Sequence, residues 1–216
     1  FVCPHACIRP FGLTDEEVAA GPEAMTVLPM KGKVKDLKYT LAISPLDCMG
    51  CGVCVKACPA DALEMVGVEG ELAQQDVFDY CVNDVADKPQ IEDTTLRGSQ
   101  FKQPLLEFSG ACAGCAQSAY ARLITQLFGD HMYISNATGC SSIWGGPAAT
   151  SPYTVNKQGH GPAWSNSLFE DNAEHGMGML LGYEAVNNML AAEAQVIIDA
   201  GAEAAEVAQA WLDARE

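Results

Sequence analysis

Basic residues are scarce in this chain of 216 residues. It carries 12 Lys and Arg against 28 Asp and Glu, a net charge of −16, and only 4 His. Phosphate backbones and anionic lipid surfaces repel such a chain, which argues against nucleic acid and membrane surfaces as partners. The sequence also lacks an apolar run of about 18 residues, so no segment is expected to span a membrane. Because 49% of the residues are hydrophobic, we expect a globular protein of one or two domains.

Cysteine is what the chain has in excess, with ten residues. Four of them stand in one run with the spacing Cys-x-x-Cys-x-x-Cys-x-x-x-Cys-Pro, namely Cys48, Cys51, Cys54 and Cys58. This spacing is typical of cubane iron–sulfur sites in bacterial ferredoxins, where the fourth cysteine binds a second cluster. A zinc site and a disulfide scaffold are the alternatives, but zinc sites usually pair two Cys-x-x-Cys arms across a longer gap.

The first residues of the chain repeat the end of that run. Cys3-Pro4 matches Cys58-Pro59, so a second run is expected to end at residue 4. The resulting 4Fe-4S cluster would have the ligands Cys3, Cys48, Cys51 and Cys54. Cys58 would then serve a cluster whose other ligands precede residue 1, and the chain is expected to be a piece of a longer polypeptide. Cluster-binding thiols also indicate a reducing, anaerobic cytoplasm.

A second group of cysteines consists of Cys112, Cys115 and Cys140. These offer three thiolates, whereas a cubane takes four. Cys7 and Cys81 are the remaining cysteines, and we expect both to be plain buried thiols, which places the fourth ligand beyond residue 216. The spacing alone leaves a redox-active dithiol open as well, since the Cys-x-x-Cys pair stands between an expected strand and an expected helix.

The chain is expected to divide into three parts. Residues 1–64 are predicted to form a ferredoxin-like α+β domain with short strands over 25–28 and 39–44. Residues 65–100 are polar and are interpreted as a linker that wraps a neighbouring surface. Residues 101–216 are predicted to begin an α/β domain.

The pattern within that third part suggests its elements. A buried strand over 105–108, a helix over 120–128 and a strand over 132–135 would make a parallel strand–helix–strand unit. Residues 135–172 are rich in small polar residues and glycine and are expected to form active-site loops. Helices are predicted over 173–199 and 203–214, broken at Gly201.

Three long stretches resemble the pyruvate:ferredoxin (flavodoxin) oxidoreductase family. They run from Gly98 to Cys115, from Asn136 to Gly146 and from Gly161 to Glu174. The ferredoxin-type run, with Ser44-Pro45-Leu46-Asp47 before it, is similar to the same family. The resemblance weakens over residues 65–97 and after about residue 185.

The resemblance implies thiamine diphosphate, magnesium and three 4Fe-4S clusters as cofactors. It implies that Cys112, Cys115 and Cys140 bind the cluster nearest to thiamine, with a fourth cysteine far downstream. The positions of Cys140 and Gln117 contact thiamine in the family, which usually has Glu at the second of these. The magnesium motif and the pyruvate-binding residues are expected outside this chain, so no catalytic residue is expected within it.

The implied fold is an α+β ferredoxin-like iron–sulfur domain followed by an incomplete α/β thiamine-diphosphate-binding fold. The implied reaction oxidises pyruvate with coenzyme A to acetyl-coenzyme A and carbon dioxide. Electrons would leave to ferredoxin or flavodoxin, and the full enzyme is expected to be a cytoplasmic homodimer. The alternatives are a stand-alone electron-transfer module without catalysis and an oxidoreductase for another 2-oxoacid.

Overall fold

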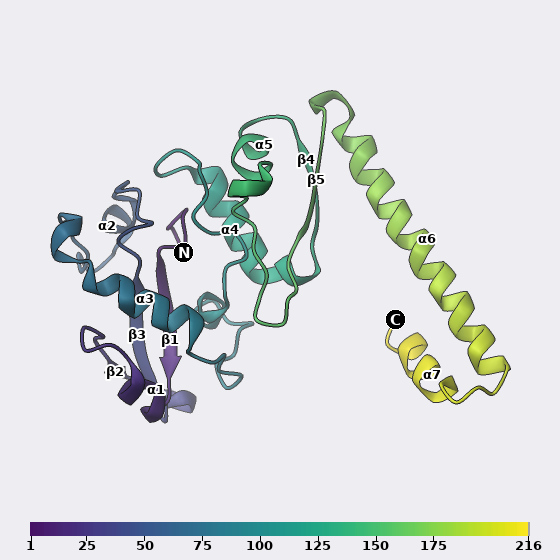
Figure 1. Cartoon of the computed structure of the whole chain (residues 1–216), viewed down its shortest axis with the longest axis horizontal. Helices are drawn as coiled ribbons and strands as arrows, with labels where there is room; N and C mark the ends of the chain where they lie inside the picture. The colour runs from purple at the N-terminus through teal and green to yellow at the C-terminus, as the bar shows by residue number, and fades with distance from the viewer. Residues whose placement is uncertain (216) are drawn as a thin grey trace. The chain divides into compact units, whose positions relative to one another are not determined.

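The structure is a computed structural model that describes residues 1–215. It contains two compact units (Figure 1). The first consists of residues 1–132 and 139–163, and the second of residues 133–138 and 164 onward. All ten cysteines lie in the first unit.

The first unit holds a small antiparallel sheet. Its strands are β1 (Ile8–Leu13), β2 (Leu28–Pro29) and β3 (Lys38–Ile43), in the order β1-β3-β2. Ile8 lies opposite Ile43, and Leu13 lies opposite Lys38. The strand predicted over 39–44 is thus confirmed to within a residue, whereas the one predicted over 25–28 is reduced to a two-residue pairing at 28–29.

Helices and short 3-10 turns surround this sheet. The helices are α1 (Asp15–Ala20), α2 (Val53–Ala57), α3 (Ala73–Asn83), α4 (Ala116–Phe128) and α5 (Cys140–Gly145). The 3-10 turns are η1 (Gly32–Val34), η2 (Val68–Gly70), η3 (Gly98–Phe101), η4 (Gly129–His131) and η5 (Ala148–Thr150). The helix predicted over 120–128 is confirmed as α4, which begins four residues earlier.

The main core lies between α3 and the sheet (Figure 1). Val77, Phe78 and Cys81 share one face of α3, as residues four apart do on a helix, and they pack against Leu13 and Ala42. This helix falls within the stretch interpreted as a linker, so that stretch contributes core side chains. Apolar burial of this kind is the main force that holds a helix on a sheet.

The predicted strand over 105–108 is wrong. Only Leu106 pairs, as an isolated bridge to Tyr153. Phe108 has φ +51°, a left-handed conformation that no strand continues through. Leu105 and Leu106 are buried as predicted, but their segment pairs with residues 152–154 through single hydrogen bonds.

The second unit contains β4 (Tyr133–Ala137), β5 (Ala163–Ser167), the turn η6 (Phe169–Asp171), α6 (Asn172–Asp199) and α7 (Ala205–Asp213). Strands β4 and β5 form a two-stranded sheet. Within residues 1–215 the predicted parallel strand–helix–strand unit is therefore absent, because β4 pairs with β5 and not with residues 105–108. The two predicted C-terminal helices are confirmed, with Gly201 at φ +59° between them.

Gly176 and Gly178 both lie within α6. A Cβ at Gly176 would meet the Ser135 side chain at 3.4 Å, whereas Gly178 has open space. Among the described helices, none is long and apolar enough to cross a membrane.

Candidate metal centre

The first cysteine group lies on a loop that leads into α2. Gly50 and Gly52 adopt φ +65° and +70°, a left-handed conformation that glycine takes without a steric penalty. These turns bring Cys48 and Cys51 onto the loop and leave Cys54 in the first turn of α2. Cys58 ends the helix, where its sulfur accepts a hydrogen bond from the Ala62 amide at 3.3 Å.

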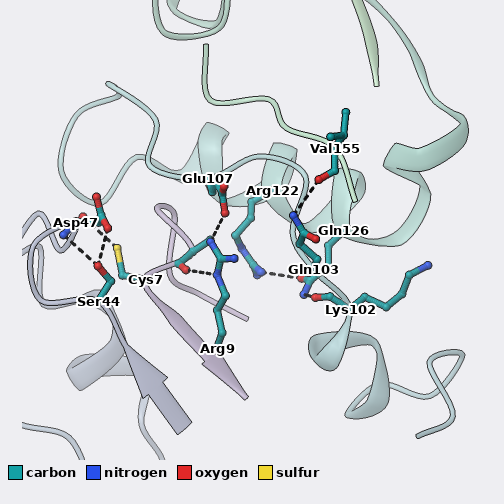
Figure 2. A network of polar contacts seen from close by, with 11 residues as sticks. Cys7, Arg9, Ser44, Asp47, Lys102, Gln103, Glu107, Arg122, Gln126 and Val155 are labelled. Atoms are coloured by element: carbon teal, nitrogen blue, oxygen red, sulfur yellow. Dashed lines mark hydrogen bonds and ion pairs between the residues drawn. The ribbon is translucent and has the colours of Figure 1, made fainter. Parts of the chain in front are cut away.

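Asp47, the residue before Cys48, accepts hydrogen bonds from two other side chains. The buried Ser44 hydroxyl donates to the Asp47 carboxylate at 2.6 Å. The buried Cys7 thiol donates to the Asp47 carbonyl at 3.0 Å (Figure 2). These bonds anchor the start of the loop to the end of β3 and to the N-terminal segment.

Cys3 lies in an environment that favours the thiolate. A hydrogen bond from the Cys7 side chain, aided by the backbone amides of Cys7, His5 and Ile8, lowers the pKa of Cys3 to about 5 although burial opposes this. The same contact and burial raise the pKa of Cys7. Thiolates are the form of cysteine that binds metals. Cys3 is therefore the more acidic of the two thiols, and its role as a ligand stays a prediction.

The cysteines predicted to share a cluster influence one another electrostatically. Burial raises the pKa of Cys54, and the charges of Cys3 and Cys51 raise it further. Cys48 and Cys3 both act on Cys7 in the same way. The hydrogen bond from Cys7 to Asp47 ties the segment that carries Cys3 to the loop of the other three predicted ligands. All ten cysteines are free thiols, and no disulfide ties them elsewhere.

Two arginines lie buried next to this group. The Arg9 side chain is ion-paired with Glu107 and donates from Nε to the Ala6 carbonyl at 2.8 Å (Figure 2). Its guanidinium also lies over the rings of Phe78 and Phe108, at 5.0 and 5.4 Å. Ala6 and Phe108 both have positive φ, and such strained residues persist only where surrounding contacts hold them.

Arg122 of α4 is the second buried arginine and is only 5% exposed. It donates to the Phe1 carbonyl at 2.6 Å and to Gln126 Oε1 at 2.7 Å. Its Nε atom is buried without a hydrogen-bond partner. Burial lowers the pKa of Arg122, and the charge of Cys3 counteracts that effect. Neither arginine could be predicted from the sequence as part of the site, because buried and exposed arginines carry no distinguishing local signal.

The second cysteine group surrounds the start of α4. Cys112 is exposed, and Cys115 directly precedes the helix. Hydrogen bonds from Ser118 and from the Gln117 amide lower the pKa of Cys115 despite partial burial, as expected for a thiol at a helix N-terminus. Gln117 is the second residue of α4 and is exposed.

Cys140 is the first residue of α5, and it is exposed. Trp144, one turn later, packs into a small core with Leu106 and Ala111, against which Cys115 also lies. The structure thereby brings α5 to the Cys112–Cys115 turn. The binding of one cluster by Cys112, Cys115 and Cys140 stays a prediction.

The two cysteine groups are adjacent. Gly114, at φ +76°, faces the loop of the first group: a Cβ there would stand 3.4 Å from Cys51 Cβ and 3.4 Å from Val53 Cγ2. At this φ a residue with a Cβ would strain the backbone. Gly114 of the second group therefore lies close to a predicted ligand of the first, with space for a Cβ between them.

These residues offer the donor types of an anionic, thiolate-bound cluster. The Cys3 sulfur receives amide hydrogen bonds, which are one of the levers by which proteins tune iron–sulfur clusters, and the neighbouring Arg122 charge lacks a carboxylate partner among the ion pairs of residues 1–215. Within residues 1–215, no three His, Cys, Asp or Glu side chains lie close enough together to hold a metal ion, so the thiols are not gathered around one point in this structure.

The histidines lie in different settings. His131 pairs with Asp130 at 2.9 Å, and His175 lies between Ser135 and Ser165 at 2.8 and 3.2 Å. His160 is exposed. His5 is buried, and both of its ring nitrogens lack hydrogen-bond partners.

Comparison with known proteins shows which proteins the chain is similar to. The 4Fe-4S binding domain family matches residues 41–64. The pyruvate-flavodoxin oxidoreductase of Klebsiella pneumoniae is 52% identical over 98% of this chain and 18% of the relative. The pyruvate:ferredoxin oxidoreductase of Moorella thermoacetica is 48% identical over 100% of the chain and 19% of the relative.

A third relative has a different name. The pyruvate dehydrogenase [NADP(+)] of Cryptosporidium parvum is 51% identical over 84% of this chain and 10% of its own length. The chain thus spans at most about a fifth of the curated relatives it matches. Over nearly its whole length, the chain belongs to the pyruvate:ferredoxin (flavodoxin) oxidoreductase family and corresponds to one segment of its members.

Proposed function

We propose that this chain is the electron-transfer segment of an enzyme that oxidises pyruvate. The reaction converts pyruvate and coenzyme A to acetyl-coenzyme A, carbon dioxide, a proton and two electrons. The observation that carries the proposal is the combination of the cubane-type cysteine run with about 50% identity to pyruvate oxidoreductases along the chain. We further propose that the enzyme is a cytoplasmic homodimer that passes electrons to ferredoxin or flavodoxin.

Thiamine diphosphate would supply the decarboxylation of the 2-oxoacid, and 4Fe-4S clusters would supply one-electron acceptors. In this chain, Cys3 and the loop cysteines would hold one cluster, with Cys58 reserved for another. The second group, Cys112, Cys115 and Cys140, would hold three corners of the cluster nearest to thiamine. Magnesium would be bound by residues of the enzyme outside this chain.

The contribution of the chain's own residues is positioning and electrostatics. Hydrogen bonds at the start of α4 lower the pKa of Cys115, and Gly114, which has no side chain, lets the two cysteine groups lie close together. We propose that Gln117 and Cys140 face thiamine. An amide at residue 117 still satisfies a polar atom of the cofactor, where an apolar side chain would leave it unpaired at a cost of about 1–3 kcal/mol.

A segment exchange tests the proposal. The matching segment of the Moorella thermoacetica enzyme is replaced by this chain, and pyruvate-dependent reduction of a viologen dye is measured with thiamine diphosphate, magnesium and coenzyme A. We expect the hybrid to keep the activity and to lose it with Cys51→Ala, while Cys81→Ala serves as the matched control. An inactive hybrid that contains its full complement of iron would contradict the proposed enzymatic role.

A further inference from the structure

The charge balance around Arg122 is unusual for a buried side chain. Arg9, the other buried arginine, has the Glu107 carboxylate as its partner. Arg122 has a carbonyl and an amide oxygen, and the ion pairs formed by residues 1–215 do not include it. Burying a cation without an anion costs free energy. A negative group next to Arg122 would offset that cost.

The neighbours of Arg122 indicate where that negative group lies. The carbonyl that accepts its hydrogen bond belongs to Phe1, two residues before Cys3. Cys3 is partly buried in the same segment. Because Cys3 is a predicted cluster ligand, the negative group expected beside Arg122 is the thiolate-bound cluster.

We propose that Arg122 is a positioning residue that supplies the compensating positive charge for the 4Fe-4S cluster bound by Cys3, Cys48, Cys51 and Cys54, and that it raises the reduction potential of this cluster. This inference rests on the proposed function. Reduction adds one electron to the cluster, with no bond formed or broken. Four thiolates already make the cluster an anion, so a nearby cation in a low-dielectric setting stabilises the reduced form more than the oxidised form.

Substitutions at Arg122 separate charge from structure. Arg122→Gln keeps an amide that can donate to the Phe1 carbonyl but removes the charge. Arg122→Lys keeps the charge but loses the planar fork of donors. Arg97→Gln removes the same charge from an exposed site, where solvent screens it. The Phe1 amino group is present in every variant, so its charge does not distinguish them.

The 216-residue chain and the three variants are reconstituted anaerobically with iron and sulfide, and their iron content is measured. Their clusters are then titrated with dithionite and redox dyes, and the reduced form is followed by electron paramagnetic resonance. At a fixed solution potential, we expect Arg122→Gln to lower the ratio of reduced to oxidised cluster about tenfold, which is about 59 mV for a one-electron couple. Arg122→Lys should stay within about threefold of the wild-type chain, and Arg97→Gln within about twofold.

The possible outcomes are distinct. A fully loaded Arg122→Gln chain with the wild-type midpoint potential would overturn the inference, as would equal shifts in the Gln and Lys variants. Loss of iron in Arg122→Gln with retention in Arg122→Lys would support it, because the charge would then be needed to hold the anionic cluster. Loss of iron in both variants would assign Arg122 to the fold alone and overturn the inference. A wild-type chain that takes up no iron would refute the proposed cluster itself.

Discussion

The two compact units differ in what they bury. The first encloses charged and polar side chains, including Arg9 and Arg122, together with its apolar core. In the second, Ala194 is the single buried residue among those described. Its long helix α6 exposes Leu180, Leu181 and many other large apolar side chains. Apolar composition therefore does not by itself give burial, and the unit with the polar interior is the one that carries every cysteine.

The largest expected effect is a loss of bound iron at the predicted metal centre of the first unit. Replacing Cys51 with Ala removes a ligand of the one cubane that this chain can complete, so the bound iron should fall from about four atoms per chain to none. Iron analysis after anaerobic reconstitution measures the change. Cys81→Ala is the control, since Cys81 is buried in the α3 core. Full iron in the Cys51→Ala chain would refute the ligand assignment.

The next effect concerns the buried charges of the first unit. Glu107→Gln leaves Arg9 without its carboxylate and should destabilise the unit by about 3 kcal/mol, the low end for a broken buried pair because Glu107 is partly exposed. Hydrogen exchange of the β1 and β3 amides reports this stability. Lys38→Met breaks the exposed contact with Asp15 and should cost less than about 1 kcal/mol. Equal losses in the two variants would show that burial does not strengthen the Arg9 pair.

A matched pair of valines compares the units directly. Val77 of α3 is 1% exposed and Val196 of α6 is 67% exposed. Val77→Ala should destabilise the first unit by about 2 kcal/mol through lost burial and a residual cavity. Val196→Ala should change the stability of α6 by less than about 0.5 kcal/mol. Hydrogen exchange of each helix gives both values, and a large loss at Val196 would mean that α6 is covered in solution.

The smallest effect is a pH dependence within the first unit. Burial disfavours the Glu17 carboxylate, but hydrogen bonds from Lys88, Thr14 and Ala86 outweigh this and lower its pKa. The stabilisation is therefore present above the unfolded pKa of about 4.3 and is lost as the pH falls through the lower folded value. Unfolding measured from pH 7 to pH 3 should show this decline in the wild-type chain and a flatter profile in Glu17→Gln. Parallel profiles would exclude Glu17 as the cause.

Periodicity in the sequence predicted the elements that local sequence determines. The β3 strand, α4, α6 and α7 followed from apolar spacing, and Gly201 marked the break between the last two helices. The strand predicted over 105–108 failed because its backbone partners, residues 152–154, lie far along the chain. A buried Leu-Leu pair fits a strand and an irregular buried segment equally well.

The candidate site also has a part that the sequence predicted and a part that it did not. The cysteine spacing indicated the ligands, because closely spaced thiols leave a pattern in sequence. The Arg9–Glu107 pair and the Arg122–Phe1 contact join residues 98 and 121 positions apart, and nothing local marks either of them. The approach of Gly114 to Cys51 also joins residues distant in sequence, so the sequence did not show that the two cysteine groups lie close together.

The hydrogen bond between Arg122 and Phe1 has a consequence for the order of events during synthesis. During synthesis, all four predicted ligands of the first cluster have left the ribosome once residue 54 has emerged. At that stage α4 has not yet been made. The buried cation reaches its place only after residue 122 has been made and α4 has folded onto the N-terminal segment. On the proposed role of Arg122, a cluster inserted early would lack its positive neighbour until α4 has folded over Phe1.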